Sequence, residues 1–93
     1  MPYRKKQQRP VLHKEELMFK VSILNPKRVL FQGEAWSVFV GGDQGEFELL
    51  EYHSPILSIL NEGEILIDQK KFIKIKGGIL RFHHNELVVL VEE

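Results

Sequence analysis

Residues 72–91, FIKIKGGILRFHHNELVVLV, decide the fold. Apolar and charged residues alternate in FIKIK, where Ile73 and Ile75 face one way and the lysines the other, which is the period of a β-strand. The two glycines that follow allow a sharp bend, and ILRFH leads to a predicted turn at His84 and Asn85. The closing run LVVLV is apolar at every position, which predicts a strand buried between two layers.

The same period of two extends back through the chain to Phe19. Turn-forming stretches separate the runs, namely NPKR, GGDQG, NEG and DQKK. Gly33 interrupts a long extended run and predicts a bulge or a tight bend there. No segment carries a helical stripe of about ten residues or more. Short strands with a turn every eight to twelve residues predict an all-β sandwich or barrel.

Length and charge exclude several classes of protein. The 93 residues fit one domain, and they include no cysteine that would form a disulfide or a thiolate metal site. The formal net charge is zero, which argues against a nucleic-acid-binding protein. No apolar run reaches the roughly 20 residues that cross a bilayer, and no secretory signal is recognisable.

The charge is nevertheless unevenly distributed. Residues 1–17 hold five basic and two acidic side chains, a net charge of +3, together with two prolines. They are predicted to form a mobile basic extension, and residues 18–93 to form the folded domain. A basic tail that touches lipid or RNA is the alternative to a solvated one. Met18 is an alternative translation start.

Candidate sites for chemistry are weak. A zinc site needs three or four convergent ligands, and His83 and His84, as neighbours in a strand, would point to opposite faces. His53 is followed directly by Ser54, whereas a base and its nucleophile usually meet across a fold. A loop histidine that bonds backbone groups or meets a partner fits better. No catalytic residue, metal site or cofactor is predicted.

The acidic residues have a similar explanation. Glu46 and Glu48 would share one face of a strand at about 6.7 Å, but alternation with Phe47 and Leu49 explains them as the solvent side of a half-buried strand. GGDQG lacks the lysine and the following helix of a phosphate-binding loop. The acidic, apolar-lined segment 42–63 is therefore predicted to be a binding surface.

Two longer stretches carry a family resemblance. These are VLFQGEAWSVFVGGDQGEFELLEYHSPILSILNEGEILI (29–67) and IKIKGGILRFHHNELVVLVEE (73–93). Their ordered motifs include an F-x-G-E-like bend, a valine-rich strand, an H-x-P-like loop, a G-x-I-x-I strand and a G-G-x-L strand. Over about residues 18–93, this order resembles the N-terminal domain of the epsilon subunit of bacterial F-type ATP synthases, called delta in mitochondria.

The resemblance implies a flattened β-sandwich of about ten short strands without catalytic residues or cofactors. It implies a rotor subunit of the central stalk that links the gamma subunit to the membrane c-ring and helps couple proton transport to ATP synthesis. The place would be the cytoplasmic face of the bacterial inner membrane, reached only through the complex and not as a homo-oligomer. Glu46 and the loop through His53 would face the ring and gamma, and Asn25 in the first turn would approach the ring.

The chain also departs from the family pattern. Glu51 and Tyr52 stand where many members have Pro-Gly, and Glu48 where many have glycine. The sequence ends at Glu93, where members continue into an inhibitory two-helix hairpin, so the resemblance implies a coupling subunit without these helices. The alternative function is a stand-alone β-sandwich protein-binding module that uses the basic tail. An enzymatic function would depend on His53, Ser54 and the nearby carboxylates.

Overall fold

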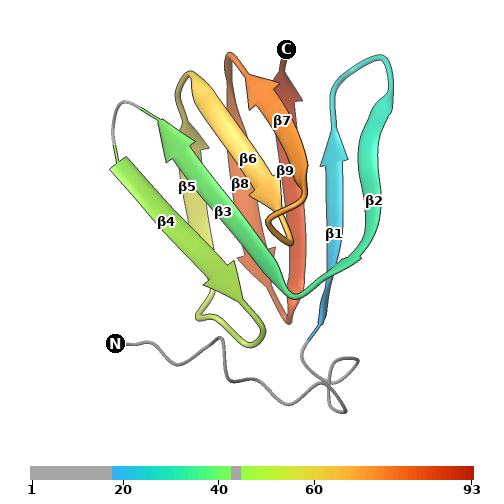
Figure 1. The fold of residues 1–93 in the computed structure, drawn as a ribbon, viewed down its shortest axis with the longest axis vertical. Helices are drawn as coiled ribbons and strands as arrows, with labels where there is room; N and C mark the ends of the chain where they lie inside the picture. Colours follow the sequence, from blue (N-terminus) through green and yellow to red (C-terminus); the bar gives the residue numbers. More distant parts are fainter. Residues whose placement is uncertain (1–17, 43–44) are drawn as a thin grey trace.

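The computed structural model describes residues 18–42 and 45–93 (Figure 1). The predicted basic extension, residues 1–17, lies outside the described residues. The described residues form nine strands and no helix, so the all-β prediction is confirmed, with nine strands where about ten are implied by the resemblance. The strands are β1 (Phe19–Leu24), β2 (Val29–Ala35), β3 (Ser37–Gly42), β4 (Gly45–Leu50), β5 (Ile56–Leu60), β6 (Gly63–Ile67), β7 (Lys71–Ile75), β8 (Gly77–His83) and β9 (Glu86–Glu92).

The strands build two sheets that pack face to face, which confirms the predicted sandwich. One sheet has five strands in the order β2-β1-β9-β8-β5, and the other has four in the order β4-β3-β6-β7. Figure 1 shows the four-stranded sheet in front of the five-stranded one. Neighbouring strands run antiparallel except β1 and β9, which lie side by side in parallel.

Alternate side chains of both sheets meet between the layers and form the core, as the period of two requires. Phe19 of β1 and Phe82 of β8 pack edge to face over the intervening strand β9, with ring centroids 5.4 Å apart. The buried hydrophobic residues are Phe19, Val21, Ile23, Ala35, Val38, Val40, Leu49, Leu60, Ile65, Ile67, Ile75, Leu80, Phe82, Leu87, Val89 and Val91.

The prediction for the closing run LVVLV is only half right. Leu87, Val89 and Val91 are buried in the core, but Leu90 is 52% exposed and Val88 is half-buried. β9 lies in the middle of its sheet, so the other sheet covers one of its faces, and no described residue forms a layer over the second. The apolar residues on that second face therefore belong to the surface of the sandwich.

The bend predicted at Gly33 lies three residues further along. Gly33 pairs regularly with β1, and the irregularity in that strand pair falls between Ile23 and Leu24 instead. The chain changes sheets at Trp36, between β2 and β3. Asp68 holds this corner, because its Oδ1 accepts hydrogen bonds from the backbone N–H groups of Trp36 (2.8 Å) and Ser37 (3.1 Å).

Candidate partner-binding surfaces

One row of apolar side chains crosses the outer face of the five-stranded sheet. The strand register places Leu24 beside Val29 and Leu90, and Ile79 beside Leu90 and Ile59, so every strand of the sheet contributes one residue. We call these five residues the apolar row. Ile59 is 78% exposed, and Val29, Leu90 and Ile79 are each about half exposed, at 54%, 52% and 48%.

The composition of the outer face changes along the strands. The row next to the apolar row is mixed, with Ser22, Val88 and Arg81 at its centre. The row beyond that is charged, where Lys20 lies beside Glu86. The apolar side chains therefore concentrate toward the end of the sandwich at which β1 ends. A contiguous exposed apolar surface of this kind is typical of a protein–protein contact.

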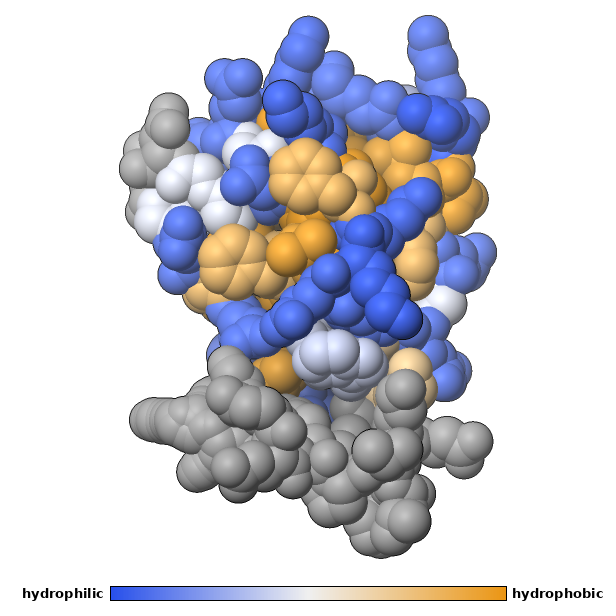
Figure 2. Space-filling model, in the orientation of Figure 1, coloured by the Kyte–Doolittle hydropathy of each residue, from blue (hydrophilic) through white to orange (hydrophobic). Residues whose placement is uncertain are grey.

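The outer face of the four-stranded sheet carries a smaller apolar group. Phe39 lies beside Leu66, and Leu66 lies beside Phe72, which is 54% exposed. Figure 2 shows this side of the molecule, with orange side chains gathered among blue ones. Glu48 lies next to Phe39 on the same face, and its carboxylate accepts a 2.6 Å hydrogen bond from the buried Ser37 hydroxyl.

Asn25 shapes the turn between β1 and β2. Its side-chain oxygen accepts hydrogen bonds from the backbone N–H groups of Lys27 (2.7 Å) and Arg28 (2.9 Å), which is the pattern of an Asx turn. Its Nδ2 donates to Glu93 (2.9 Å), and Arg28 also donates to both carboxylate oxygens of Glu93 at 3.0 Å. Asn25 therefore orders this turn and joins it to the end of β9.

Glu46 lies at the same end of the sandwich as Asn25. It is exposed at the start of β4, where it pairs with Gly41, and Gly41 pairs with Glu64 on its other side. Glu46 and Glu62 also line a hollow of about 340 Å³ between the edges of the two sheets. Figure 1 shows the β1–β2 connection and the end of β3 at the top of the molecule. The tip of this end is polar, with acidic groups on the side of β4 and β5, and the apolar row lies next to it on the outer face of the five-stranded sheet.

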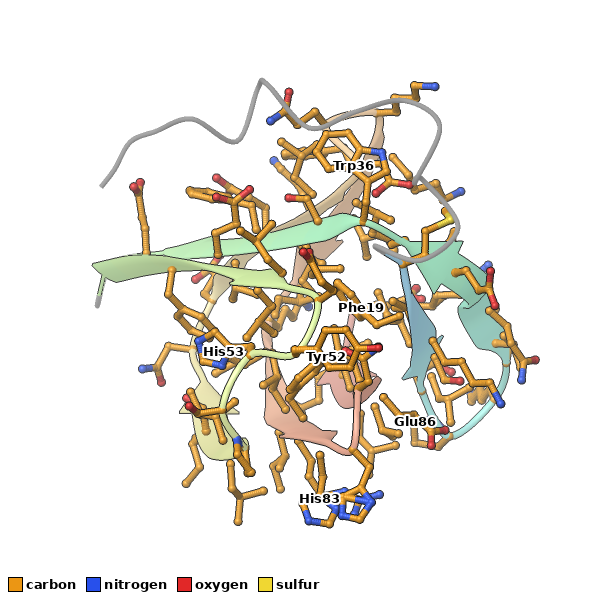
Figure 3. All side chains as sticks on the ribbon, turned by 90° about the horizontal axis from the view of Figure 1, so that it is seen from below. Phe19, Trp36, Tyr52, His53, His83 and Glu86 are labelled. Carbon is orange, nitrogen blue, oxygen red and sulfur yellow. The ribbon has the colours of Figure 1, made fainter. Side chains whose placement is uncertain are left out.

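His53 lies at the opposite end, beyond the last residue of β4. Its Nδ1 lies 2.7 Å from the carbonyl oxygen of Ser54, and its ring packs edge-on against Phe82 at 6.0 Å. The side chain thus bonds a backbone group, as the sequence predicted for a loop histidine, and its Nδ1 contact is not with the Ser54 hydroxyl. Figure 3 looks onto this end of the molecule.

Asn85 connects its own turn to two other segments at this end of the molecule. Its Oδ1 accepts a 2.6 Å hydrogen bond from the Tyr52 N–H in the β4–β5 loop, and its Nδ2 donates to the Met18 carbonyl at 3.3 Å. Its own carbonyl accepts from the Lys20 N–H at 3.3 Å. Its backbone is left-handed, with φ of 59°, a conformation that asparagine adopts more readily than most residues. One side chain in the β8–β9 turn therefore links two other segments.

The structure separates the three residues that the resemblance places at partner interfaces. Asn25 and Glu46 share one end, whereas His53 is at the other, because β4 runs the length of the sandwich between Glu46 and His53. Because Glu46 and His53 are only seven residues apart in the sequence, the sequence alone did not predict this separation. The apolar row was also missed, although its signal is visible as apolar residues on both faces of the closing strand.

The histidines and acidic side chains of the described residues do not gather as metal ligands. Residues 18–42 and 45–93 contain no group of three histidine, cysteine or acidic side chains placed to hold a metal ion. His83 and His84 stack at 3.9 Å rather than pointing to opposite faces, because His84 leaves the strand with φ of 51°. No helix in the described part of the chain is long and apolar enough to cross a membrane.

The described residues thus form a β-sandwich whose outer surface carries an exposed apolar row and a polar end. Residues 18–93 match the family described as ATP synthase, Delta/Epsilon chain, beta-sandwich domain. The chain therefore belongs to this family of non-catalytic ATP synthase subunits, and the resemblance found in the sequence is confirmed.

Individual relatives agree with this assignment. The chain is 35% identical over 77 residues to the ATP synthase epsilon chain of Sulfurimonas denitrificans, covering 78% of this chain and 59% of that protein. It is 29% identical over 79 residues to the epsilon chain of Chlorobium limicola, covering 81% of this chain and 90% of that protein. The first relatives are thus matched over about 60% of their length.

A solved structure shares the fold. The match is a chain in the cryo-EM structure of the Tetrahymena thermophila mitochondrial ATP synthase central stalk and c-ring, with a TM-score of 0.68 and 13% identity. The matched region covers 80% of this chain and 63% of that chain. At this identity the similarity shows the β-sandwich fold alone.

Proposed function

We propose that this protein is a central-stalk subunit of a rotary F-type ATP synthase, linking gamma to the c-ring and coupling proton transport to ATP synthesis. It would work at the cytoplasmic face of a bacterial inner membrane and contact the membrane only through the complex. The observation that carries the proposal is the placement of an apolar face and a polar end on one sandwich. A part that links two partners needs two such surfaces.

The apolar row is the proposed contact with gamma. Burial of one Val, Leu or Ile side chain contributes about 1.5–3 kcal/mol. The five residues of the row are roughly half exposed, so covering them would contribute about 4–8 kcal/mol before the cost of association. The row brings together Val29, Ile59, Ile79 and Leu90, each about half exposed or more, and in this proposal it supplies the greater part of the binding free energy.

The polar end is the proposed contact with the c-ring. The turn around Asn25 and the exposed Glu46 present charged and hydrogen-bonding groups to a partner's polar loops. Exposed ion pairs contribute only about 0.2–1 kcal/mol each. This contact would therefore orient the subunit on the ring and would add little to its affinity. His53 lies at the far end, away from both the turn around Asn25 and the apolar row, so its contact with gamma or the ring stays a prediction of the family resemblance.

We also propose that this function does not require a helical hairpin. The support comes from the Chlorobium limicola epsilon chain, of which the match covers 90%, so that protein is little longer than the matched sandwich. The described surfaces of this chain all lie on the sandwich itself. In this proposal the sandwich alone links gamma to the ring.

Co-purification with the gamma subunit of the same organism tests the proposal. The two chains are expressed together and separated by gel filtration, and we expect one complex with one copy of each. The double variant Ile59→Glu/Ile79→Glu should weaken binding at least about 100-fold, or 2.7 kcal/mol. Phe72→Glu on the other sheet, at 54% exposure, is the matched control and should bind normally.

Two results would overturn the proposal. Separate elution of the two chains well above micromolar concentration would exclude the rotor function and favour the stand-alone binding module. Equal weakening by Phe72→Glu and by the double variant would show that gamma does not recognise the apolar row.

A further inference from the structure

The sandwich has four edge strands, and one of them lacks the usual protection. Natural edge strands carry charges, prolines or bulges that prevent pairing with another chain. β2 has Glu34, β4 has Glu46, and β7 has Lys71 and Lys74. β5, Ile56–Leu60, has the sequence ILSIL and contains no charged residue.

The side chains of β5 are also unusually exposed. Ile59 and Leu57 point outward and expose 78% and 73% of their surface. β5 pairs with β8 on one side, and no described strand pairs with its other side. In an antiparallel pair every second residue turns its N–H and C=O away from the partner strand. β5 therefore combines open backbone groups with exposed apolar side chains.

Two hollows lie against this strand. One, of about 340 Å³, is lined by Ser58, Ile59 and Leu60 together with residues of the opposite sheet around Glu46. The other, of about 330 Å³, is lined by Ile56 and Leu57 with part of β8. Proteins that bind a partner's strand at a sheet edge use backbone hydrogen bonds for affinity and pockets beside the strand for alternate side chains. β5 offers both elements.

We propose that β5 is a docking edge at which the gamma subunit adds a sixth strand to the five-stranded sheet. The added segment would be extended, without charges at alternate positions, and apolar where it lies beside Leu57 and Ile59. The apolar row ends on β5 at Ile59, so a strand placed beside β5 continues the same apolar surface. One partner then covers the row and the edge together. This inference rests on the proposed function.

Hydrogen exchange of the complex with gamma distinguishes strand addition from contact through the face alone. In the free chain, the outward amides of β5 should exchange rapidly because no described strand pairs with them. In the complex, strand addition should slow them at least about tenfold, while the outward amides of the edge strand β7 stay unchanged. Leu57→Lys, which lies outside the apolar row, should weaken gamma binding at least about tenfold without lowering the melting temperature. Phe72→Lys is its matched control.

Each outcome decides between the two proposals. If the complex forms and the β5 amides stay unprotected, strand addition is wrong and the central-stalk function stands. If no complex forms, both fail. If β5 becomes protected in the free chain as its concentration rises, and Leu57→Lys abolishes this, the edge binds a second copy and the gamma assignment is overturned.

Discussion

Replacing Asn85 tests whether one side chain holds three segments of the chain together. Asn85→Gly keeps the left-handed backbone accessible but removes the hydrogen bonds to Tyr52 and Met18. A typical hydrogen bond contributes about 0.5–1.5 kcal/mol, and the 3.3 Å bond belongs at the low end. We therefore expect a loss of about 1–2 kcal/mol in the free energy of unfolding. Asn85→Ala should lose about 1 kcal/mol more, because alanine is strained at φ of 59°.

Urea denaturation measures these losses, with exchange of the Tyr52 amide as a local readout. The expected changes are large for a small domain, whose total stability is about 5–15 kcal/mol. The Tyr52 amide should exchange at least about tenfold faster in both variants. His84→Gly is the control, because His84 is also left-handed, with φ of 51°, and its described side-chain contact is the stacking on His83. A stable Asn85→Gly variant with a protected Tyr52 amide would refute the reasoning.

Three further substitutions and one control probe other contacts. Gly63→Ala would place a Cβ against the Gly41 carbonyl, and this overpacking should lower the free energy of unfolding by about 1–3 kcal/mol, as measured by urea denaturation. Gly33→Ala is the control and should be close to neutral, because the nearest atom to its added Cβ lies 3.6 Å away. Asp68→Gly keeps the turn but removes the acceptor of two backbone N–H groups, and a loss of about 2–3 kcal/mol is expected by the same measurement. Arg28→Ala should change the melting temperature little, because its ion pair is exposed and contributes at most about 1 kcal/mol; a large drop would contradict this.

Local patterns in the sequence located the strands well. Alternation at Phe19–Ile23 and Ile73–Ile75 depends only on neighbouring residues, so it predicts each strand and its inward face. The parallel pairing of β1 and β9 joins residues far apart in the chain, and no local pattern reports it. Gly33 showed a related limit, because glycine permits a bend without requiring one.

The surfaces were harder to predict than the fold. The closing run LVVLV combines core residues with Leu90 of the apolar row, and hydrophobicity alone does not separate burial in a core from burial by a partner. Glu46 and His53 are close in sequence, yet a strand between them carries them to opposite ends of the molecule. The proposed partners were inferred from the family resemblance, and the apolar row was identified only from the register of the strands.

The parallel pair of β1 and β9 also governs how the domain is made. β1, the first strand of the described sandwich to be synthesised, lies beside β9, the last strand of that sandwich. Until β9 emerges, β1 and β2 have no connection through backbone pairing to β8 and β5. Native contacts between such distant parts of a chain form slowly, and incomplete sheets expose apolar strands. The nascent sandwich must therefore stay soluble until β9 has been made, and the uncharged β5 edge is the part most in need of protection during that time.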